Sequence, residues 1–205
     1  MKRSVFKRIL ILCEDKKSSV KYFKHFLNDE KLKRELASVS IEIYQPKKHQ
    51  PIGLVKEAKR RQQTAKNEKN PFDEIWIIMD HDNHPNLKQA FDMAKTQKKI
   101  HIALSIICFE IWLILHFQKK APAFDNCSKI ENELKKHLKT YEKNIKSTDI
   151  ETLFDKIPAA LENAEWLEDQ NRQNMASGTD ILNIGAYTDV HKIVKKLYSP
   201  DEYLH

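Results

Sequence analysis

Two aspartates separated by one residue, Asp80 and Asp82, follow a short apolar run at residues 75–79. An unbroken apolar run of this length is typical of a strand buried on both faces. Two carboxylates about 4 Å apart repel each other by about 4 kcal/mol at an effective dielectric constant of about 20. Such a pair is stabilised by a divalent cation, or else one carboxylate takes up a proton. Because carboxylate oxygens are hard ligands, the pattern predicts bound Mg²⁺ or Mn²⁺.

A glutamate follows a second apolar run in the same way. Residues 8–13 form this run, Glu14 comes directly after it, and Ser18 or Ser19 is expected to cap the helix that follows. Since parallel strands open at one edge of a sheet, we expect Glu14 to lie beside the two aspartates as a third metal ligand. A carboxylate at a strand end can also simply cap the next helix. Three of them at one edge favour the metal site.

Strands and helices alternate through the first two-thirds of the chain. Strands are predicted at about 8–13, 39–44, 73–79 and 100–107, and helices at about 18–29 and 52–68 and after Pro85. The alternating apolar and polar residues at 39–44 indicate an exposed edge strand. This order predicts an α/β fold with a mainly parallel four-stranded sheet flanked by helices.

A change of pattern after Cys108 predicts a helical C-terminal part. The segment 109–117 is apolar nearly all round, which indicates a buried helix with His116 as a core histidine. Glu110 in its first turn either favours the helix N-terminus or acts as a further metal or auxiliary site residue. Helices at about 128–145, at about 149–169 and after Asp189, with a loop at 171–185, complete the chain. We therefore expect a catalytic core at 1–118 and a helical extension packed on it at 119–205.

The composition indicates a folded chain with a polyanionic partner. The 205 residues carry a net charge of +7, and basic residues concentrate beside Glu14 and on the predicted helix at 52–68. A lysine-rich helix can be only a solvated face, but beside a metal site it predicts contacts with a phosphate backbone. The candidate nucleic-acid contacts are Lys16, Lys17, Lys56, Lys59, Arg60 and Arg61.

The number and spacing of the cysteines and the length of the apolar segments indicate the cellular compartment of the protein. The three cysteines are widely spaced and odd in number, which predicts reduced thiols and a cytoplasmic protein, with Cys13 and Cys108 in the core. The apolar stretch near the N-terminus is too short for a signal peptide, and no segment has the length that a membrane span requires.

A glutamate after the first strand and an Asp-x-Asp after a later one is the arrangement of Toprim domains, a Rossmann-like fold found in topoisomerases, primases and overcoming-lysogenization-defect nucleases. The chain resembles, more closely, the RloB-like family. The resemblance rests on Cys13-Glu14 with Tyr22-Phe23, on Asp80-His81-Asp82-Asn83-His84-Pro85-Asn86, on the segment from Cys108-Phe109-Glu110 to His116-Phe117, and on the tail Thr188-Asp189-Val190-His191-Lys192.

The resemblance implies a Toprim-type nuclease in bacterial defence against phage, of the abortive-infection kind, working with an AAA/ABC-like ATPase. By position, Glu14 would be a general acid/base or metal ligand, Asp80 and Asp82 would be metal ligands, and Glu110 would be auxiliary. One or two Mg²⁺ ions would orient the phosphodiester of DNA or RNA, including tRNA, and activate water. A homo-oligomer is left open.

The chain departs from the family's pattern at three places. Glu-Gly after the first strand is Glu14-Asp15 here, a Thr-Glu pair is Ser18-Ser19, and Asp-Arg-Asp-Asp is Asp80-His81-Asp82-Asn83. The second and third changes each remove an acidic side chain that a second metal would need, and Asp15 is the candidate replacement. Three hypotheses therefore stand: a metal-dependent nuclease, a catalytically weakened Toprim-fold subunit that binds nucleic acid or regulates a partner, and a Toprim enzyme that performs another phosphoryl transfer.

Overall fold

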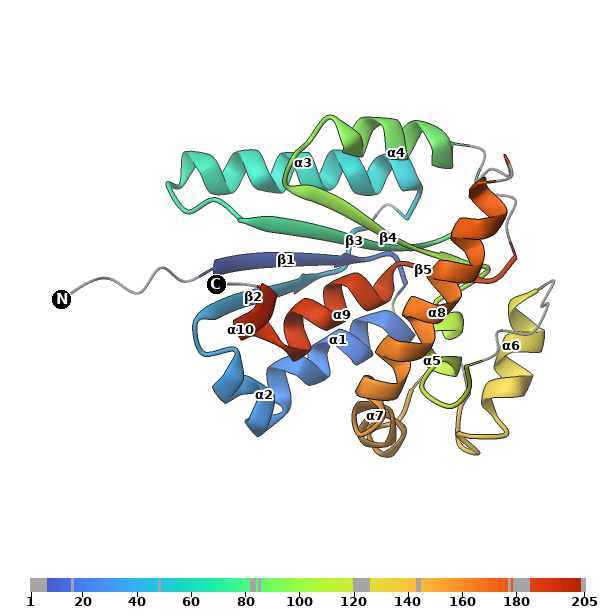
Figure 1. Ribbon diagram of the computed structural model, residues 1–205. Helices are drawn as coiled ribbons and strands as arrows, with labels where there is room; N and C mark the ends of the chain where they lie inside the picture. The colour runs from blue at the N-terminus through green and yellow to red at the C-terminus, as the bar shows by residue number, and fades with distance from the viewer. Residues whose placement is uncertain are drawn as a thin grey trace. The chain divides into compact units, whose positions relative to one another are not determined.

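The computed structural model describes residues 7–15, 17–47, 49–81, 84, 86–119, 126–142, 145–176, 178 and 185–203. Its sheet has five strands in the order β2-β1-β3-β4-β5 (Figure 1). They are β1 (Lys7–Cys13), β2 (Val39–Tyr44), β3 (Glu74–Asp80), β4 (Ile100–Ile106) and β5 (Tyr187–Thr188).

The sheet is parallel except at one edge. β1 pairs in parallel with β2 on one side and with β3 on the other. The N–H groups of Ile75 and His81 donate to the carbonyls of Lys99 and Ser105, so β3 and β4 also run in one direction. β5 is antiparallel to β4. The predicted α/β fold with a mainly parallel sheet is confirmed, and so is the edge position of β2. The prediction of four strands is wrong by one, because a two-residue strand has no periodicity to recognise.

The chain forms two compact units that interleave along the sequence. The first comprises Met1–Met79, Asn83–Ala103 and Lys195–His205, and the second comprises Asp80–Asp82 and Leu104–Val194. A functional division after residue 118 stays a prediction.

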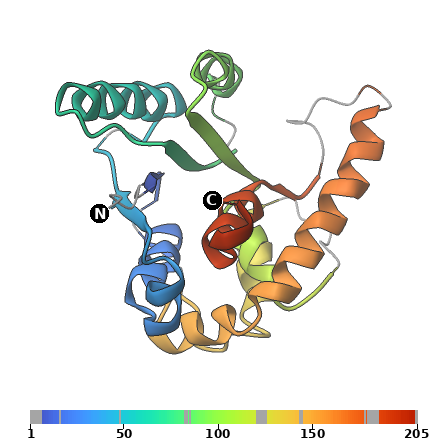
Figure 2. The same ribbon diagram turned by 60° about the vertical axis from the view of Figure 1, so that its left-hand side comes forward.

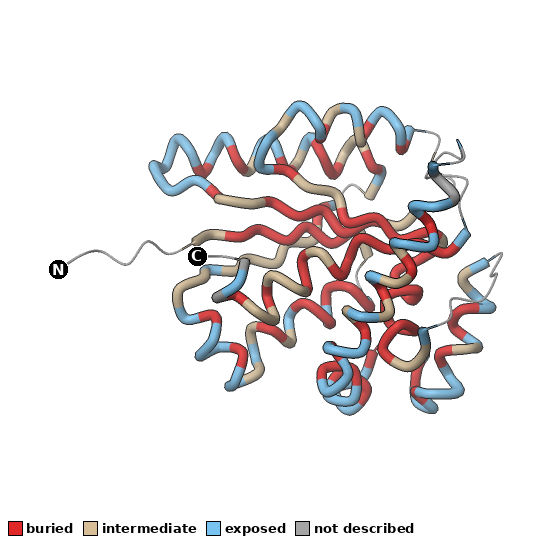
Figure 3. The backbone as a smooth tube through the Cα atoms, viewed as in Figure 1, coloured by how far each residue is buried: buried red, intermediate tan, exposed pale blue. Residues whose placement is uncertain are grey.

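In the first unit, helices cover both faces of the strands. α3 (Pro51–Asn67) and α4 (Leu87–Lys95) lie on one face, and α1 (Ser18–Asn28) and α2 (Glu30–Glu35) lie on the other (Figures 1 and 2). The interior positions of β1 and β3 are buried, as their apolar runs predict (Figure 3). Two further helices, α9 (Val190–Tyr198) and α10 (Pro200–Tyr203), follow β5 in the chain.

The second unit is largely helical. Its helices are α5 (Glu110–Ile114), α6 (Cys127–Leu134), α7 (Ser147–Phe154) and α8 (Ile157–Ala176). α5 and α8 pack against each other and against β5. The segment around α5 is buried, as predicted, and no helix among the described residues is long and apolar enough to cross a membrane.

The predicted helix at 149–169 is two helices. α7 ends at Phe154 and α8 begins at Ile157, with Pro158 in the first turn of α8. Proline has no N–H to donate and its ring clashes with the carbonyl four residues before it, so it disrupts a helix that continues through this point. The predicted helix at 128–145 is also too long, since α6 ends at Leu134.

Two of the three cysteines form a disulfide, between Cys108 and Cys127, so the expectation of three reduced thiols is wrong for this structure. The fold brings their Cα atoms to 5.9 Å, within the range for a disulfide, although 19 residues separate them. Cys13 and Cys108 are buried, as predicted.

Candidate functional site

Glu14 follows β1 directly and is held by its backbone on two sides. Its N–H donates to the carbonyl of Ile78 in β3 at 3.0 Å, and its own carbonyl lies 2.7 Å from His49 Nδ1. Its side chain is 14% exposed, and its Oε1 lies 3.4 Å from His84 Nε2. The Glu14 side chain therefore lies beside an imidazole, and its role as a metal ligand or general acid/base stays a prediction.

The two aspartates of the predicted metal site end the third strand and follow it. Asp80 is the last residue of β3, and the next N–H, that of His81, donates to the carbonyl of Ser105 at 2.9 Å. The backbone that presents Asp80 is therefore part of the sheet ladder. Asp82 lies outside the described residues, and its role as a ligand stays a prediction.

Asp15 caps α1. Its carboxylate accepts hydrogen bonds from the N–H groups of Lys17, at 2.5 Å, and Ser19, at 3.1 Å. These are donors of the kind that a helix N-terminus leaves without an intrahelical partner. The prediction that Ser18 or Ser19 caps this helix is wrong, because the acid that precedes them reaches the same donors.

A cleft of about 740 Å³ in the first unit lies between the end of β2 and the start of α3. It is lined by Tyr44, Pro46, Lys47, His49, Gln50, Ile52, Gly53, Lys56, Glu57 and Arg60. His49 links the cleft to Glu14 through the hydrogen-bond contact with the Glu14 carbonyl. Three basic side chains, Lys47, Lys56 and Arg60, and an aromatic ring therefore surround a space next to the predicted catalytic glutamate.

The candidate nucleic-acid contacts on α3 differ in their surroundings. Lys56, Lys59 and Arg60 are exposed. Glu57 accepts hydrogen bonds from Arg60 at 2.7 and 2.8 Å and from Arg61 at 2.9 Å, and the bonds from Arg60 are the main cause of a lowered pKa of Glu57. The Arg61 guanidinium also stacks on the ring of Tyr44, 3.2 Å from its centroid.

The Arg61 guanidinium is therefore held by Tyr44 and Glu57. We expect Lys56, Lys59 and Arg60, which are more exposed, to make most of the phosphate contacts. Of the two lysines near Glu14, Lys17 is exposed and Lys16 lies outside the described residues.

Glu110 is the first residue of α5 and is buried, with 7% of its surface exposed. The Tyr141 hydroxyl donates a hydrogen bond to Glu110 Oε1, and Cys127 Sγ lies 3.5 Å from Oε2. Both contacting residues, Tyr141 and Cys127, follow Glu110 in the sequence and lie in the second unit. They hold the carboxylate in one orientation, and its auxiliary catalytic role stays a prediction.

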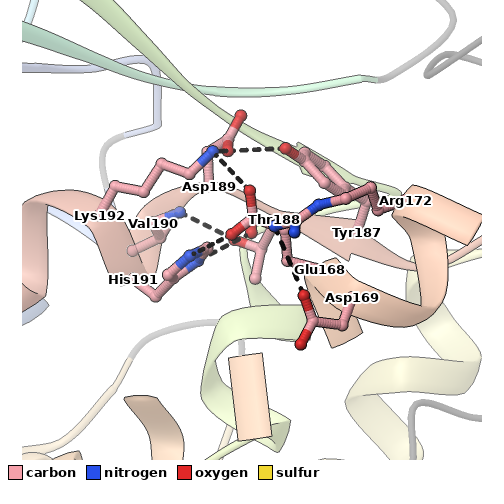
Figure 4. A network of polar contacts seen from close by, with 9 residues as sticks. All are labelled: Glu168, Asp169, Arg172, Tyr187, Thr188, Asp189, Val190, His191 and Lys192. Carbon is pink, nitrogen blue, oxygen red and sulfur yellow. Dashed lines mark hydrogen bonds and ion pairs between the residues drawn. The ribbon is translucent and has the colours of Figure 1, made fainter. Parts of the chain in front are cut away.

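The tail motif that carries part of the family resemblance forms a polar network in the second unit (Figure 4). Glu168 of α8 accepts hydrogen bonds from His191 and Lys192, both at 3.1 Å. Asp189 accepts one from the Tyr187 hydroxyl at 2.7 Å and pairs with Lys192 at 2.5 Å. Burial is the largest cause of the lowered pKa of His191. The network fastens β5 and the start of α9 to α8, which is a structural role.

The chain belongs to the RloB-like protein family, since the sequence model of that family matches residues 9–197. The matched region includes Glu14, Asp80, Asp82 and Glu110 as well as the tail network. No curated protein and no solved structure matches the chain. The family, the α/β sheet and the placement of the acids are thus the basis for a functional proposal.

Three residues near Glu14 are not recognisable as site residues from the sequence pattern. His84 lies beside the Glu14 carboxylate, His49 beside its carbonyl, and Tyr44 on the cleft wall. A signal existed only for His84, which stands in the motif that follows β3. His49 and Tyr44 are on a loop and a strand end, and nothing in their spacing indicates the neighbourhood of Glu14.

Proposed function

We propose that this RloB-like protein is a metal-dependent nuclease of the Toprim type, which hydrolyses phosphodiester bonds of DNA or RNA in defence against phage together with an AAA/ABC-like ATPase. Glu14, Asp80 and Asp82 are its proposed Mg²⁺ or Mn²⁺ ligands. The observation that carries the proposal is the position of two acids in the sheet topology. Glu14 follows β1 and Asp80 ends β3, and these strands are neighbours that run in parallel.

The topology supports a ligand site at these strand ends. The chain leaves β1 along one face of the sheet, through α1 and α2, to reach β2, and it crosses by the other face, through α3, to reach β3 (Figures 1 and 2). In open α/β sheets, ligands bind outside the carboxyl ends of the strands at the point where the connections change face. That point lies between β1 and β3.

The donor set fits a hard cation. Mg²⁺ and Mn²⁺ prefer carboxylate oxygens, and a bound ion of this kind would orient the phosphodiester, activate water and stabilise the leaving oxygen. The chain's own residues would bind the substrate and move protons. Lys47, Lys56 and Arg60 would hold the phosphate backbone in the cleft beside Glu14. Glu14 Oε1, 3.4 Å from His84 Nε2, would exchange a proton with that imidazole.

One observation favours the second hypothesis, a catalytically weakened subunit that binds nucleic acid or regulates its partner. Where the family pattern has a second acid shortly after Glu14, this chain has Ser18-Ser19, and Asp15 is the nearest acid that could replace it. The Asp15 carboxylate accepts the N–H groups of Lys17 and Ser19, so its oxygens already have backbone donors. One metal rather than two is the occupancy that this arrangement supports.

The test is cleavage of plasmid DNA and of bulk tRNA with Mg²⁺, with Mn²⁺ and with chelator, in the presence and absence of the candidate ATPase. Glu14→Gln and Asp80→Asn are run beside Asp92→Asn, which neutralises an exposed acid on α4 as a matched control. We expect metal-dependent cleavage that both site variants abolish and the control retains. Absence of cleavage under every condition, with nucleic-acid binding intact, would favour the weakened subunit. Cleavage that survives in both site variants would refute the assignment of the ligands.

A further inference from the structure

A second group of metal-binding residue types lies in the second unit. Cys108 follows β4, Glu110 begins α5, and Cys127 and Glu131 stand one turn apart on α6. Cys108, Glu110 and Glu131 are buried, with 3%, 7% and 8% of their surfaces exposed.

The distances from Cys127 Sγ to two carboxylates of this group are those of a tetrahedral zinc site. Cys127 Sγ lies 3.5 Å from Glu110 Oε2 and 3.6 Å from Glu131 Oε1. The candidate ligand atoms of Cys108, Glu110 and Cys127 all lie within 4.8 Å of one another. With Zn–S about 2.3 Å and Zn–O about 2.0 Å, a tetrahedral site separates sulfur and oxygen by about 3.5 Å and two sulfurs by about 3.8 Å. Two of the four sulfur–oxygen spacings, both from Cys127 Sγ, therefore already match. Glu131 stands outside the group that lies within 4.8 Å.

A hydrogen bond orients one of the carboxylates. The Tyr141 hydroxyl, itself buried, donates to Glu110 Oε1, and the other oxygen, Oε2, is the one near Cys127. Metal-binding carboxylates commonly carry such a second hydrogen bond, which fixes the direction of the binding oxygen. Tyr141 thus supports Glu110 as a ligand.

We propose that, once the Cys108–Cys127 disulfide is reduced, Cys108, Cys127 and Glu110 bind one Zn²⁺, and that the Glu131 side chain, one turn from Cys127 on α6, rotates in as the fourth ligand. A dithiol reductant supplies two electrons and two protons, the S–S bond breaks to two thiols, and the reductant becomes a disulfide. Each thiol then loses its proton to solvent as its sulfur binds Zn²⁺. The Cα separation of 5.9 Å lets the two sulfurs move apart by side-chain rotation.

This site is independent of the proposed nuclease metals. Its ligands include thiolates, which favour Zn²⁺ over Mg²⁺ or Mn²⁺, whereas the proposed nuclease site offers carboxylates. The ion would fasten the exit of β4 and the start of α5 to α6, and so would act as a structural link within the second unit. Glu110 would then have a structural role even if the nuclease proposal fails.

The experiment uses the full chain, reduced with a phosphine and freed of excess reductant under argon, and titrated with Co²⁺ as a spectroscopic substitute for Zn²⁺. We expect one Co²⁺ per chain, with the near-ultraviolet charge-transfer band of thiolate ligation and the visible bands of a tetrahedral ion. Added Zn²⁺ should remove both. The oxidised chain should show neither, and binding of Co²⁺ to carboxylates elsewhere cannot produce the thiolate band.

Three variants make the test specific. Cys127→Ser should lose the thiolate band of the paired cysteines, Glu131→Gln should weaken Co²⁺ affinity by more than about tenfold, and Cys13→Ala, at the cysteine outside the disulfide, should change neither. Absence of a thiolate band in the reduced wild-type chain would overturn the proposal. So would a full-strength band in Cys127→Ser, or unchanged affinity in Glu131→Gln.

Discussion

Replacement of His116 should remove a specific part of the protein's sensitivity to acid. His116 is 2% exposed, its Nδ1 lies 3.0 Å from the carbonyl of Trp112, and its ring packs edge-on against the Trp112 ring. Burial is the main reason that its pKa falls from the usual 6.5 to about 3, and the nearby Lys156 adds to the effect. The backbone hydrogen bonds act in the opposite direction and are outweighed.

The magnitude follows from the protons bound by the folded and unfolded chains. Between pH 6.5 and about 3 the unfolded chain protonates this histidine and the folded chain does not, so stability falls as the pH falls. Each pH unit below the unfolded pKa costs about 1.4 kcal/mol. Between pH 7.5 and pH 5.0, His116 should therefore lower the free energy of unfolding by about 2 kcal/mol.

The assay compares urea unfolding of the disulfide-bonded wild type, His116→Gln and His116→Phe at both pH values. Other titrating groups are common to the three proteins and cancel in the difference. The wild type should lose about 2 kcal/mol more than either variant when the pH falls to 5.0. The two variants differ in packing and hence in absolute stability, but they should share the same pH dependence. A wild type and variants that lose equal stability would refute the reasoning that His116 is buried and neutral.

Three further predictions concern the first unit. The Gln62 side chain accepts a hydrogen bond from the Phe72 N–H at 3.0 Å and donates one to the Phe72 carbonyl at 2.8 Å. Gln62→Leu should therefore lower the free energy of unfolding in urea by about 2 kcal/mol. A decrease below about 0.5 kcal/mol would contradict this. Burial raises the pKa of Glu74, but hydrogen bonds, chiefly from Lys196, outweigh it and lower the pKa below its usual value. Lys196→Met should therefore lower the free energy of unfolding at neutral pH, and this loss should shrink as the pH falls through the folded pKa of Glu74. A loss that does not depend on pH would contradict a stabilising Glu74–Lys196 ion pair. Lys56→Gln should reduce the salt slope of nucleic-acid binding by about 0.8, equally for all sequences, and an unchanged slope would remove Lys56 from the proposed interface.

Several features of this protein are predictable from short stretches of sequence. The continuous apolar runs of β1 and β3 and the alternating pattern of β2 correctly predict two buried strands and one edge strand. Glu14 is recognisable because it directly follows such a run, and His116 because it stands in a segment that is apolar all round. The strand and helix predictions succeed because periodicity is a local property of the sequence. A residue that directly follows an apolar run must also lie at the end of that strand.

The sequence by itself thus determined the α/β class, the buried strands, the family and the acids that follow the strands. Only the tertiary structure decided that Cys108 pairs with Cys127 and that Tyr141 holds Glu110. The physical reason is distance along the chain. Contacts between residues 19 or 31 positions apart depend on how whole helices pack, and no spacing rule in the sequence encodes that packing.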